Sequence, residues 1–356
     1  MQIGFARRHA GLMPGLLFGL AVLCSGLVPR TVQAQDAAKS SPMTLQVGQI
    51  SDSIAFFPIF VAKKQGFFAR HGLQVGDIPL LGTGAKLAAA LQSGSIDVAG
   101  GNGTDPLNLY RVNKSTRMIA QLVNTYYVDV ITGPSFAGRS ETAPLANRIK
   151  ALRGKKIGVT GPGSGTQALV DFLLGMQGMR SATDVTLVSL GSNMTGALGA
   201  LKTGRVDALS FPQPVGQQAE ATHSGSIYIS PAQGDIPQLR QVVHGVVFTT
   251  QPVLDHKGPA VIAFVRGIAD AEQFIHSADA SSVRALFKAY RPTMGDATVD
   301  RLLTILRAEI PADPGISQAE FEGEVQFNLK SGLIKEAPDY ATMVPSQWLN
   351  TALGRH

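Results

Sequence analysis

The segment Leu91-Gln-Ser-Gly-Ser-Ile-Asp97 returns 110 residues later as Leu201-Lys-Thr-Gly-Arg-Val-Asp207. The leucine, the glycine and the aspartate are identical in the two copies and share this one offset. The same offset brings Val47-Gly48 onto Ile157-Gly158. The alternative explanation is coincidence among common strand and helix-cap residues. We favour an internal repeat, which predicts two domains of the same strand–helix–strand design.

Around both copies, short β-branched runs alternate with helical patterns, as in parallel sheets that are linked by helices. The first half predicts strands at residues 44–50, 73–80 and 96–99, and helices at 55–68 and 85–93. The second half predicts strands at 155–160, 185–190 and 206–211, and helices at 166–176 and 195–203. Extended segments are expected at 117–123 and 128–132, and further helices at 261–277, 281–290, 297–309 and 318–329. The predicted fold class is therefore α/β.

The last four predicted helices have no strand of their own, so we expect them to pack back onto the first domain. The chain must then cross between the domains twice, outward near 126–133 and back near 245–250, and two crossing strands make a hinge. This predicts domain 1 as residues 44–128 together with 250–350, and domain 2 as residues 129–249.

Residues 1–34 have the pattern of a secretory signal peptide. Arg7 and Arg8 precede an apolar run at 16–28, and Val32-Gln-Ala34 offers a cleavage site. An uncleaved membrane anchor is the alternative, but the run is shorter than the roughly 20 residues that a spanning helix needs. A lipid anchor is disfavoured because Leu23, rather than a small residue, precedes Cys24. We expect a periplasmic protein that is cleaved near Ala34.

The composition excludes several classes of protein. The 356 residues carry 31 basic and 25 acidic side chains, a net charge of +6, with 44% hydrophobic residues and one cysteine. Three of the basic residues and the cysteine lie in the predicted signal peptide, so cleavage lowers the net charge to +3. The apolar content excludes a disordered chain, and the small remaining charge comes without a nucleic-acid-binding motif. No disulfide and no cysteine-based zinc site is expected.

The common catalytic and nucleotide-binding motifs are missing from the sequence. Gly161-Pro-Gly-Ser-Gly165 has glycine where a serine-hydrolase elbow needs serine. Gly165 is followed directly by Thr166, so neither a P-loop lysine nor the third glycine of a dinucleotide fingerprint is present. The histidines are scattered without metal-ligand spacing. We predict no catalytic residue, no metal and no cofactor.

Small polar turns follow six of the predicted strands. In open α/β sheets, ligands bind beyond the carboxyl ends of the strands, where helix N-termini present free N–H groups and a positive dipole end. Turns of both domains that face one cleft would form a cage of hydrogen-bond donors. The candidate ligand-binding residues, in and beside these turns, are Ser51, Asp52, Ser53, Phe56, Gly82, Thr83, Asn102, Gly103, Thr104, Asp105, Tyr126, Gly163, Ser164, Thr166, Ser192, Asn193, Phe211 and Gln213.

Each of these residues also has a purely structural interpretation. Serine, threonine and aspartate at such positions cap helices, and Phe56, Tyr126 and Phe211 are either core residues or flank a planar ligand. Asp52 and Asp105 are either caps or partners of a ligand ammonium group. No arginine lies in the predicted turns, so an anionic ligand would rely on helix N-termini and hydroxyl groups. Low aromatic content, 6%, disfavours a sugar.

A longer motif brings a family resemblance. The segment Ala55-Phe-Phe-Pro-Ile-Phe-Val-Ala-Lys-Lys-Gln-Gly-Phe-Phe68 combines an apolar helix, Ala-Lys and Gly-Phe-Phe, and Gly72-Leu73 follows. Together with the segments 91–99 and 152–159, it resembles the substrate-binding proteins of ABC importers in the NMT1/THI5-like group. That group includes binders of aliphatic sulfonates, taurine, nitrate and thiamine-precursor pyrimidines. The resemblance covers roughly residues 44–274.

The resemblance implies a two-domain type II periplasmic-binding-protein fold that closes on its ligand about a two-strand hinge. It implies a non-enzymatic, periplasmic solute-binding protein, expected to be monomeric. The implied partners are a small ligand (a sulfonate, carboxylate, nitrate or pyrimidine-like compound) and an ABC transporter permease. The alternatives are an enzyme of the same fold acting on a small aromatic or pyrimidine-like metabolite, and a periplasmic sensor component. The pyrimidine-synthesising relatives use a cysteine-rich segment, which this chain lacks.

Overall fold

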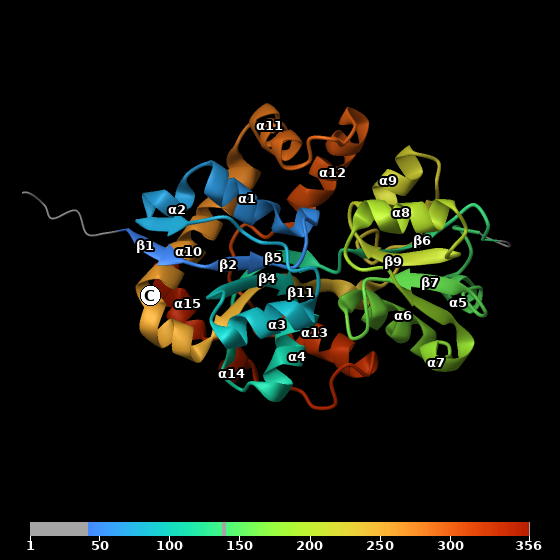
Figure 1. Cartoon of the computed structure of the whole chain (residues 1–356), viewed down its shortest axis with the longest axis horizontal. Helices are drawn as coiled ribbons and strands as arrows, with labels where there is room; N and C mark the ends of the chain where they lie inside the picture. Colours follow the sequence, from blue (N-terminus) through green and yellow to red (C-terminus); the bar gives the residue numbers. More distant parts are fainter. Residues whose placement is uncertain (1–41, 137–139, 356) are drawn as a thin grey trace, which may run out of the picture. The chain divides into compact units, whose positions relative to one another are not determined.

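The computed structural model describes residues 42–136 and 140–355, and the residues from Pro42 onward form one compact unit. The predicted signal peptide lies outside the described residues. Two main sheets organise the unit (Figure 1). The first has the order β2-β4-β11-β5, formed by Val47–Gln49, Val98–Asn102, Arg240–Thr250 and Thr116–Thr125. The second has the order β10-β6-β9-β7-β8, formed by Ser226–Ile229, Val128–Thr132, Ala208–Pro212, Lys156–Val159 and Thr186–Ser189.

Helices cover both sheets and define two lobes, each named here by its sheet. The first lobe also contains β1 (Met43–Leu45), β3 (Leu73–Val75) and the helices α1 (Phe57–Lys64), α2 (Phe67–Arg70), α3 (Gly84–Ser93), α4 (Thr104–Val112), α10 (Gln251–Ser277), α11 (Ala280–Tyr290), α12 (Asp296–Glu309), α13 (Gln318–Lys330), α14 (Tyr340–Met343) and α15 (Ser346–Ala352). The second lobe contains α5 (Leu145–Lys150), α6 (Gly165–Gly175), α7 (Ser181–Asp184), α8 (Met194–Lys202) and α9 (Val215–Ala221). Figure 1 shows α8 and α9 on one face of the second sheet and α6 and α7 on the other. The α/β class is confirmed.

The offset of 110 residues holds in the strand pairing. Val47 pairs with Val98 in parallel, and Ile157 pairs with Ala208 in the same way. The aspartates at equivalent positions of the two copies make the same hydrogen bond. Asp97 accepts the backbone N–H of Gln46 at 2.8 Å, and Asp207 accepts the backbone N–H of Lys156 at 2.8 Å. In each copy the carboxylate ties the strand after the helix to the strand before it. This shared role explains why the aspartate occurs in both copies.

The two equivalent aspartates make a matched test of this contact. Asp97 is buried and also binds the Lys257 ammonium at 2.7 Å, whereas Asp207 is half-buried and forms no ion pair in the described part of the chain. Asp97→Ala is expected to lower the free energy of unfolding by about 2 kcal/mol, because the hydrogen bond to the Gln46 N–H and the ion pair with the exposed Lys257 ammonium are lost together. Asp207→Ala is expected to cost about 1 kcal/mol. Chemical denaturation measures both, and equal losses would contradict the stated role of Lys257.

The chain passes between the lobes at two neighbouring places. It leaves the first sheet after β5 through Tyr126 and Tyr127 and enters β6, and it returns along β11, which pairs antiparallel with β4 and β5. Because β11 starts at Arg240, the first sheet extends to residues before the predicted return boundary at 249/250. The exact domain boundaries stay a prediction.

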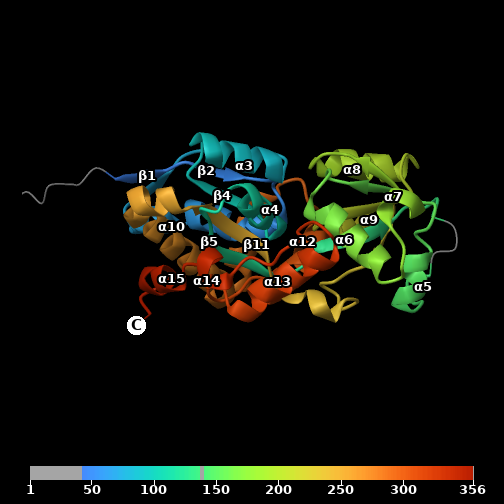
Figure 2. The same ribbon diagram turned by 90° about the horizontal axis from the view of Figure 1, so that it is seen from below.

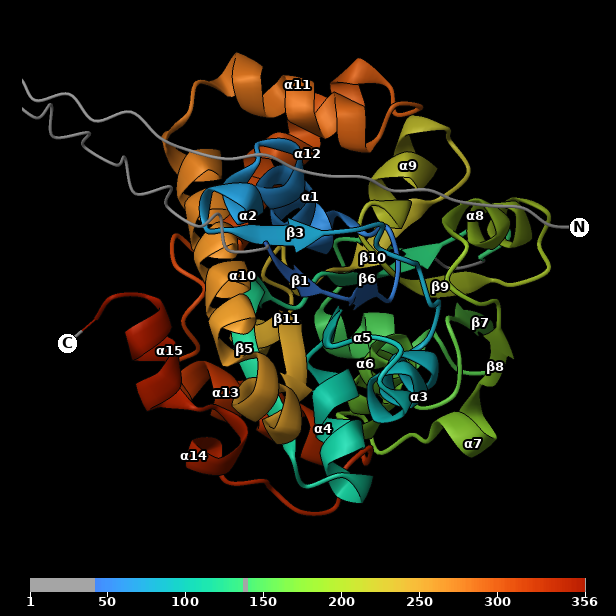
Figure 3. The same ribbon diagram turned by 60° about the vertical axis from the view of Figure 1, so that its left-hand side comes forward.

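The C-terminal helices pack mainly on the first lobe but also reach the second. α10 packs on α1 and α2 through pairs such as Phe68 and Phe264, whose ring centroids are 4.7 Å apart (Figure 3). α13 lies along β11 (Figure 2), and its Phe327 contacts Phe172 of α6 at 5.2 Å between ring centroids. Arg301 of α12 forms a 2.7 Å ion pair with Glu220 of α9. These helices therefore form part of the contact between the lobes.

Candidate functional site

A cavity of about 530 Å³ lies between the two lobes. The carboxyl ends of β2, β4 and β7 open onto it, as expected for an open α/β sheet. Most of its wall is apolar, with a few hydroxyl, amide and backbone groups. The lining residues are Ile50, Ser51, Gly82, Thr83, Gly84, Ala85, Ala88, Asn102, Asp105, Asn108, Leu109, Arg111 and Val112 from the first lobe, Tyr127 and Val128 from the crossing, and Thr160, Gly161, Pro162, Gly163, Ser164, Thr166, Ser192, Met194 and Pro212 from the second lobe.

Helix N-termini from both lobes meet at this cavity. The Thr83 hydroxyl caps α3 by accepting the N–H of Lys86 at 3.2 Å. The Ser164 hydroxyl caps α6 by accepting the N–H of Gln167 at 3.3 Å. Both caps line the cavity, so the positive dipole ends of two helices of ordinary length are directed at one space. Such an arrangement favours a ligand with a negatively charged or hydrogen-bond-accepting group.

Nine of the eighteen predicted residues line the cavity. They come from all the first-lobe turns and from two of the second-lobe turns, which supports the expectation that these turns face one cleft. They are Ser51, Gly82, Thr83, Asn102, Asp105, Gly163, Ser164, Thr166 and Ser192. Their role as ligand contacts stays a prediction.

The structure places the other nine away from this wall. Phe56, Tyr126 and Phe211 are completely buried core side chains, and Gly103, Thr104, Ser53 and Gln213 are buried in contacts between elements. The Ser53 hydroxyl, for example, donates to the Gln213 carbonyl at 3.0 Å and so joins the lobes. The last two, Asp52 and Asn193, line a neighbouring cavity of about 430 Å³.

The two candidate aspartates have clear structural partners. Asp52 binds Arg291 at 2.5 Å, and Arg291 also approaches the Met194 sulfur of the second lobe at 3.9 Å. Asp105 accepts the N–H of Asn102 at 2.8 Å and so ties the first turn of α4 to the end of β4, while it also lines the cavity. Burial, with a smaller contribution from the charge of Glu324, raises the pKa of Asp105 to about 7 against the opposing effect of the Asn102 bond. Near neutral pH this carboxyl is therefore partly protonated.

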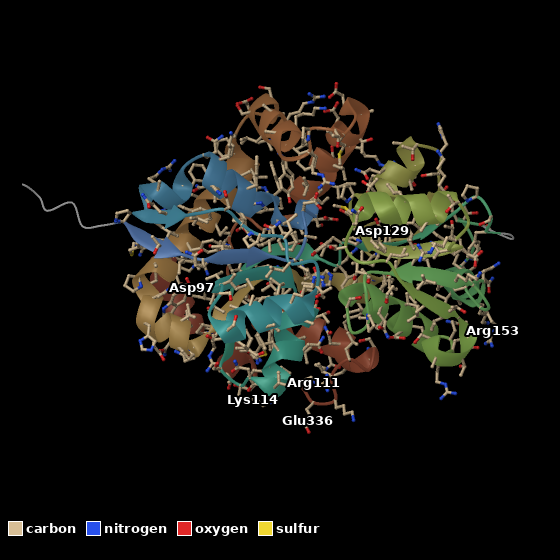
Figure 4. All side chains as sticks on the ribbon, in the orientation of Figure 1. Asp97, Arg111, Lys114, Asp129, Arg153 and Glu336 are labelled. Atoms are coloured by element: carbon tan, nitrogen blue, oxygen red, sulfur yellow. The ribbon has the colours of Figure 1, made fainter. Side chains whose placement is uncertain are left out.

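Sequence reasoning missed a set of lining residues on α4. Asn108, Leu109 and Val112 line the cavity from the same helix face as the predicted Asp105. Arg111 is the basic residue among the lining residues that the structure describes. Its guanidinium donates to the Leu333 carbonyl at 3.3 Å. Figure 4 shows Arg111 beside Lys114 near the carboxyl end of α4. A helical prediction for residues 104–112 would have identified this face.

Further contacts close the lobes around the cavity. The Asn108 side chain donates to the Gly163 carbonyl at 3.2 Å, and the buried Tyr126 hydroxyl donates to the Gly165 carbonyl at 2.6 Å. The crossing residue Tyr127 donates to the side chain of Asn102. These bonds join the turns of one lobe to helix α6 and to the hinge, so movement between the lobes would change the shape of the cavity.

Other kinds of site are not found in the described residues. Within 42–136 and 140–355, no group of three or more His, Cys, Asp or Glu side chains is arranged to hold a metal ion. In the same ranges no helix has both the length and the apolarity that crossing a bilayer requires.

Comparisons with known proteins agree with this geometry. A model of the NMT1-like family matches residues 36–287. No curated protein matches the chain significantly. Among solved structures, a protein from Bordetella bronchiseptica is 23% identical with a TM-score of 0.75, and the match covers 89% of this chain and 98% of the other.

Two further structures are of proteins with named ligands. The alkanesulfonate-binding protein SsuA from Xanthomonas axonopodis pv. citri, bound to MOPS, is 18% identical with a TM-score of 0.68, covering 86% of this chain and 99% of the other. The periplasmic nitrate-binding protein NrtA from Synechocystis PCC 6803 is 15% identical with a TM-score of 0.67, covering 88% and 90%. At such identities the likeness establishes the fold, and the predicted two-domain periplasmic-binding-protein fold is confirmed.

Proposed function

We propose that this chain, which belongs to the NMT1-like family, is a solute-binding protein that encloses one small organic ligand between its two lobes. The observation that carries the proposal is the cavity of about 530 Å³, walled by both lobes and facing the N-termini of α3 and α6. A cavity of this size suits a small organic molecule, and two crossing segments allow the lobes to close on it.

The wall favours an organic anion with an apolar body. Arg111 and the two helix N-termini supply positive potential, and partial protonation of Asp105 near neutral pH reduces the opposing negative charge. Ile50, Leu109 and Val112 offer apolar surface to the rest of the ligand. An aliphatic or aromatic sulfonate or carboxylate uses both features, whereas nitrate leaves the apolar surface uncovered.

The biological setting is part of the same proposal. We propose that the chain is exported, that its signal peptide is removed near Ala34, and that it acts as a monomer in the periplasm. There it would deliver the ligand to an ABC transporter permease without changing it chemically. The family, and the sulfonate- and nitrate-binding proteins of the same fold, support this assignment.

A thermal-shift screen tests the proposed function. The probes are hexanesulfonate, benzoate, nitrate, a methylpyrimidine and benzylamine, the last sharing the ring of benzoate but carrying the opposite charge. At least one organic anion is expected to raise the melting temperature in a saturable way, since a ligand at 100 times its Kd stabilises the folded state by about 2.7 kcal/mol. Benzylamine is expected to do less than benzoate.

The outcomes separate the alternatives. Stabilisation by no organic anion would contradict the proposal. Stabilisation followed by loss of the compound from solution would favour the alternative of an enzyme on the same fold. A stronger response to benzylamine than to benzoate would show that Asp105, not Arg111 and the helix N-termini, sets the charge preference.

A further inference from the structure

Two buried carboxyl groups, one from each lobe, lie close enough for the charge of one to raise the pKa of the other, and neither lines the ligand cavity. Glu309 lies at the end of α12 in the first lobe, and Asp129 lies on β6 in the second. Figures 1 and 3 show α12 beside α9, and Figure 4 shows Asp129 on the part of the second lobe near the first. Asp129 is fully buried and Glu309 is 4% exposed.

The two carboxyl groups lie among unpartnered oxygen atoms. Within the described part of the chain, both Asp129 oxygens, Oε2 of Glu309 and the amide oxygens of Gln213 and Gln217 have no hydrogen-bond partner. The Gln213 amide donates to the other Glu309 oxygen at 3.3 Å, which bridges the lobes. Ser230 and Gln217 approach Asp129 and lower its pKa, but neither meets hydrogen-bond geometry. The cluster therefore has more acceptor oxygens than its donors satisfy.

The surrounding charges do not compensate for these acids. Glu220 of α9 and Asp235 both face Asp129, and each is already paired: Glu220 with Arg301 at 2.7 Å, and Asp235 with Arg148 at 2.5 Å.

Around Glu309, the nearby titratable groups are Asp129 and the buried Tyr127. The neighbouring His276 ring bonds the Ile310 carbonyl at 2.9 Å. Among the described residues, no cation forms an ion pair with either Glu309 or Asp129. Two ionised carboxylates in this dry contact would repel each other across the lobes.

We propose that Glu309 and Asp129 form a proton-dependent latch, which holds the lobes together when the carboxyls are protonated and releases them when both ionise. Protons on the carboxyls supply donors for the oxygen atoms that have no hydrogen-bond partner. The latch rests on the proposed opening of the lobes about the hinge. It further implies that the protein takes up protons when the lobes close.

The sign of the pH dependence follows from the two states. Burial raises the pKa of Asp129 to about 7, and burial together with the charge of Asp129 raises that of Glu309 to about 8. In separated lobes the carboxyls meet water and return toward their usual values, 3.8 and 4.5. The latch is thus fully present below about pH 4, weakens as pH rises and is lost above about pH 8. Within that window the ratio of closed to open protein falls up to about tenfold per pH unit for each proton released.

Small-angle X-ray scattering and hydrogen exchange of the ligand-free protein at pH 6 and pH 9 test the latch. The wild type is expected to have a larger radius of gyration at pH 9. Exchange in α9 and α12, corrected for the intrinsic effect of pH, is expected to be at least about tenfold faster there. Glu309→Gln, and the double change Glu309→Gln with Asp129→Asn, keep the shape of the side chains but cannot ionise. The double variant is expected to give the same radius and protection at both pH values.

Asp296→Asn is the matched control, because Asp296 lies on the same helix but is exposed and paired with Lys288 and Arg284. It should retain the wild-type response. An unchanged wild-type radius between pH 6 and pH 9, or an unchanged response in the double variant, overturns the latch. Loss of protection in β7 and β11 as well would indicate global destabilisation and also overturns it. Since no ligand is present, these results are independent of the thermal-shift screen, so either proposal can fail alone.

Discussion

Replacing Gly103 with alanine is expected to lower the free energy of unfolding by about 3 kcal/mol, because the added methyl group has no room. Its Cβ would lie 2.6 Å from the Glu324 side chain and closer still to the Val243 carbonyl oxygen, in the fixed backbone of β11. Gly103 joins β4 to α4 and packs on the returning crossing strand, so the backbone of either segment must move. Chemical denaturation with circular dichroism measures the loss.

Gly199→Ala is the control for this prediction. Gly199 is an exposed residue within α8, and an added Cβ meets nothing within 4 Å. The change is expected to stabilise the protein by roughly 0.5–1 kcal/mol, because alanine loses less backbone entropy in a helix. A loss below about 1 kcal/mol in Gly103→Ala would show that β11 and α4 are not packed as tightly as described. Gly103 would then regain its interpretation as a ligand-facing turn.

Replacing Ala85 with tryptophan is expected to weaken ligand binding at least about 100-fold, or roughly 2.7 kcal/mol, with little change in stability. Ala85 lies in the first turn of α3, is exposed, and lines the cavity. An indole there would bury roughly 150–250 Å² of surface that the ligand otherwise covers. Isothermal titration calorimetry with the most stabilising compound of the screen measures the change.

Ala89→Trp separates blocking of the cavity from a general effect of tryptophan. Ala89 lies one turn further along the same helix and is exposed, but it does not line the cavity. The affinity of the Ala89→Trp variant for the same compound should stay within about twofold of the wild-type affinity, a change of roughly 0.4 kcal/mol in binding free energy. Equal affinities in Ala85→Trp and the wild type would place the ligand elsewhere.

The fold was predictable because the repeat fixes the strand pairs. Asp97 and Asp207 have the same partner in each copy, so one offset in the sequence identified equivalent elements. Helices α4 and α9 were missed. Their starts look like turns: Pro106 follows a glycine-rich segment, and Gly216 follows Pro214. Proline is tolerated in the first turn of a helix, where its missing N–H needs no partner.

The sequence predicted the site only where the position of the backbone alone determines which residues reach the cavity. Turns after parallel strands must gather at one edge, and so Ser51, Thr83 and Ser164 reach one cavity. The direction of a side chain depends on what packs against it. Phe211 therefore lies in the core, although the next residue, Pro212, lines the cavity. Arg111 reaches the wall from the far end of a helix that was not predicted.

The interlobe carboxyl pair was also beyond sequence reasoning. Asp129 and Glu309 are 180 positions apart in the chain. Nothing in the sequence around either residue distinguishes it from an ordinary surface acid. The contact of α12 with α9 places Glu309 against the second lobe, where both carboxyls are buried. Buried acids without counter-charges are costly, and such costs persist mainly where they serve a change of state.

The cavity between the lobes is proposed to bind one small organic anion and to return it unchanged. Isothermal titration of the wild-type protein with the best compound of the screen, followed by recovery of that compound, tests both parts of this proposal. We expect a saturable heat with one site per chain and full recovery of the intact compound. Heat that never saturates, or a compound recovered as a different molecule, would contradict the account.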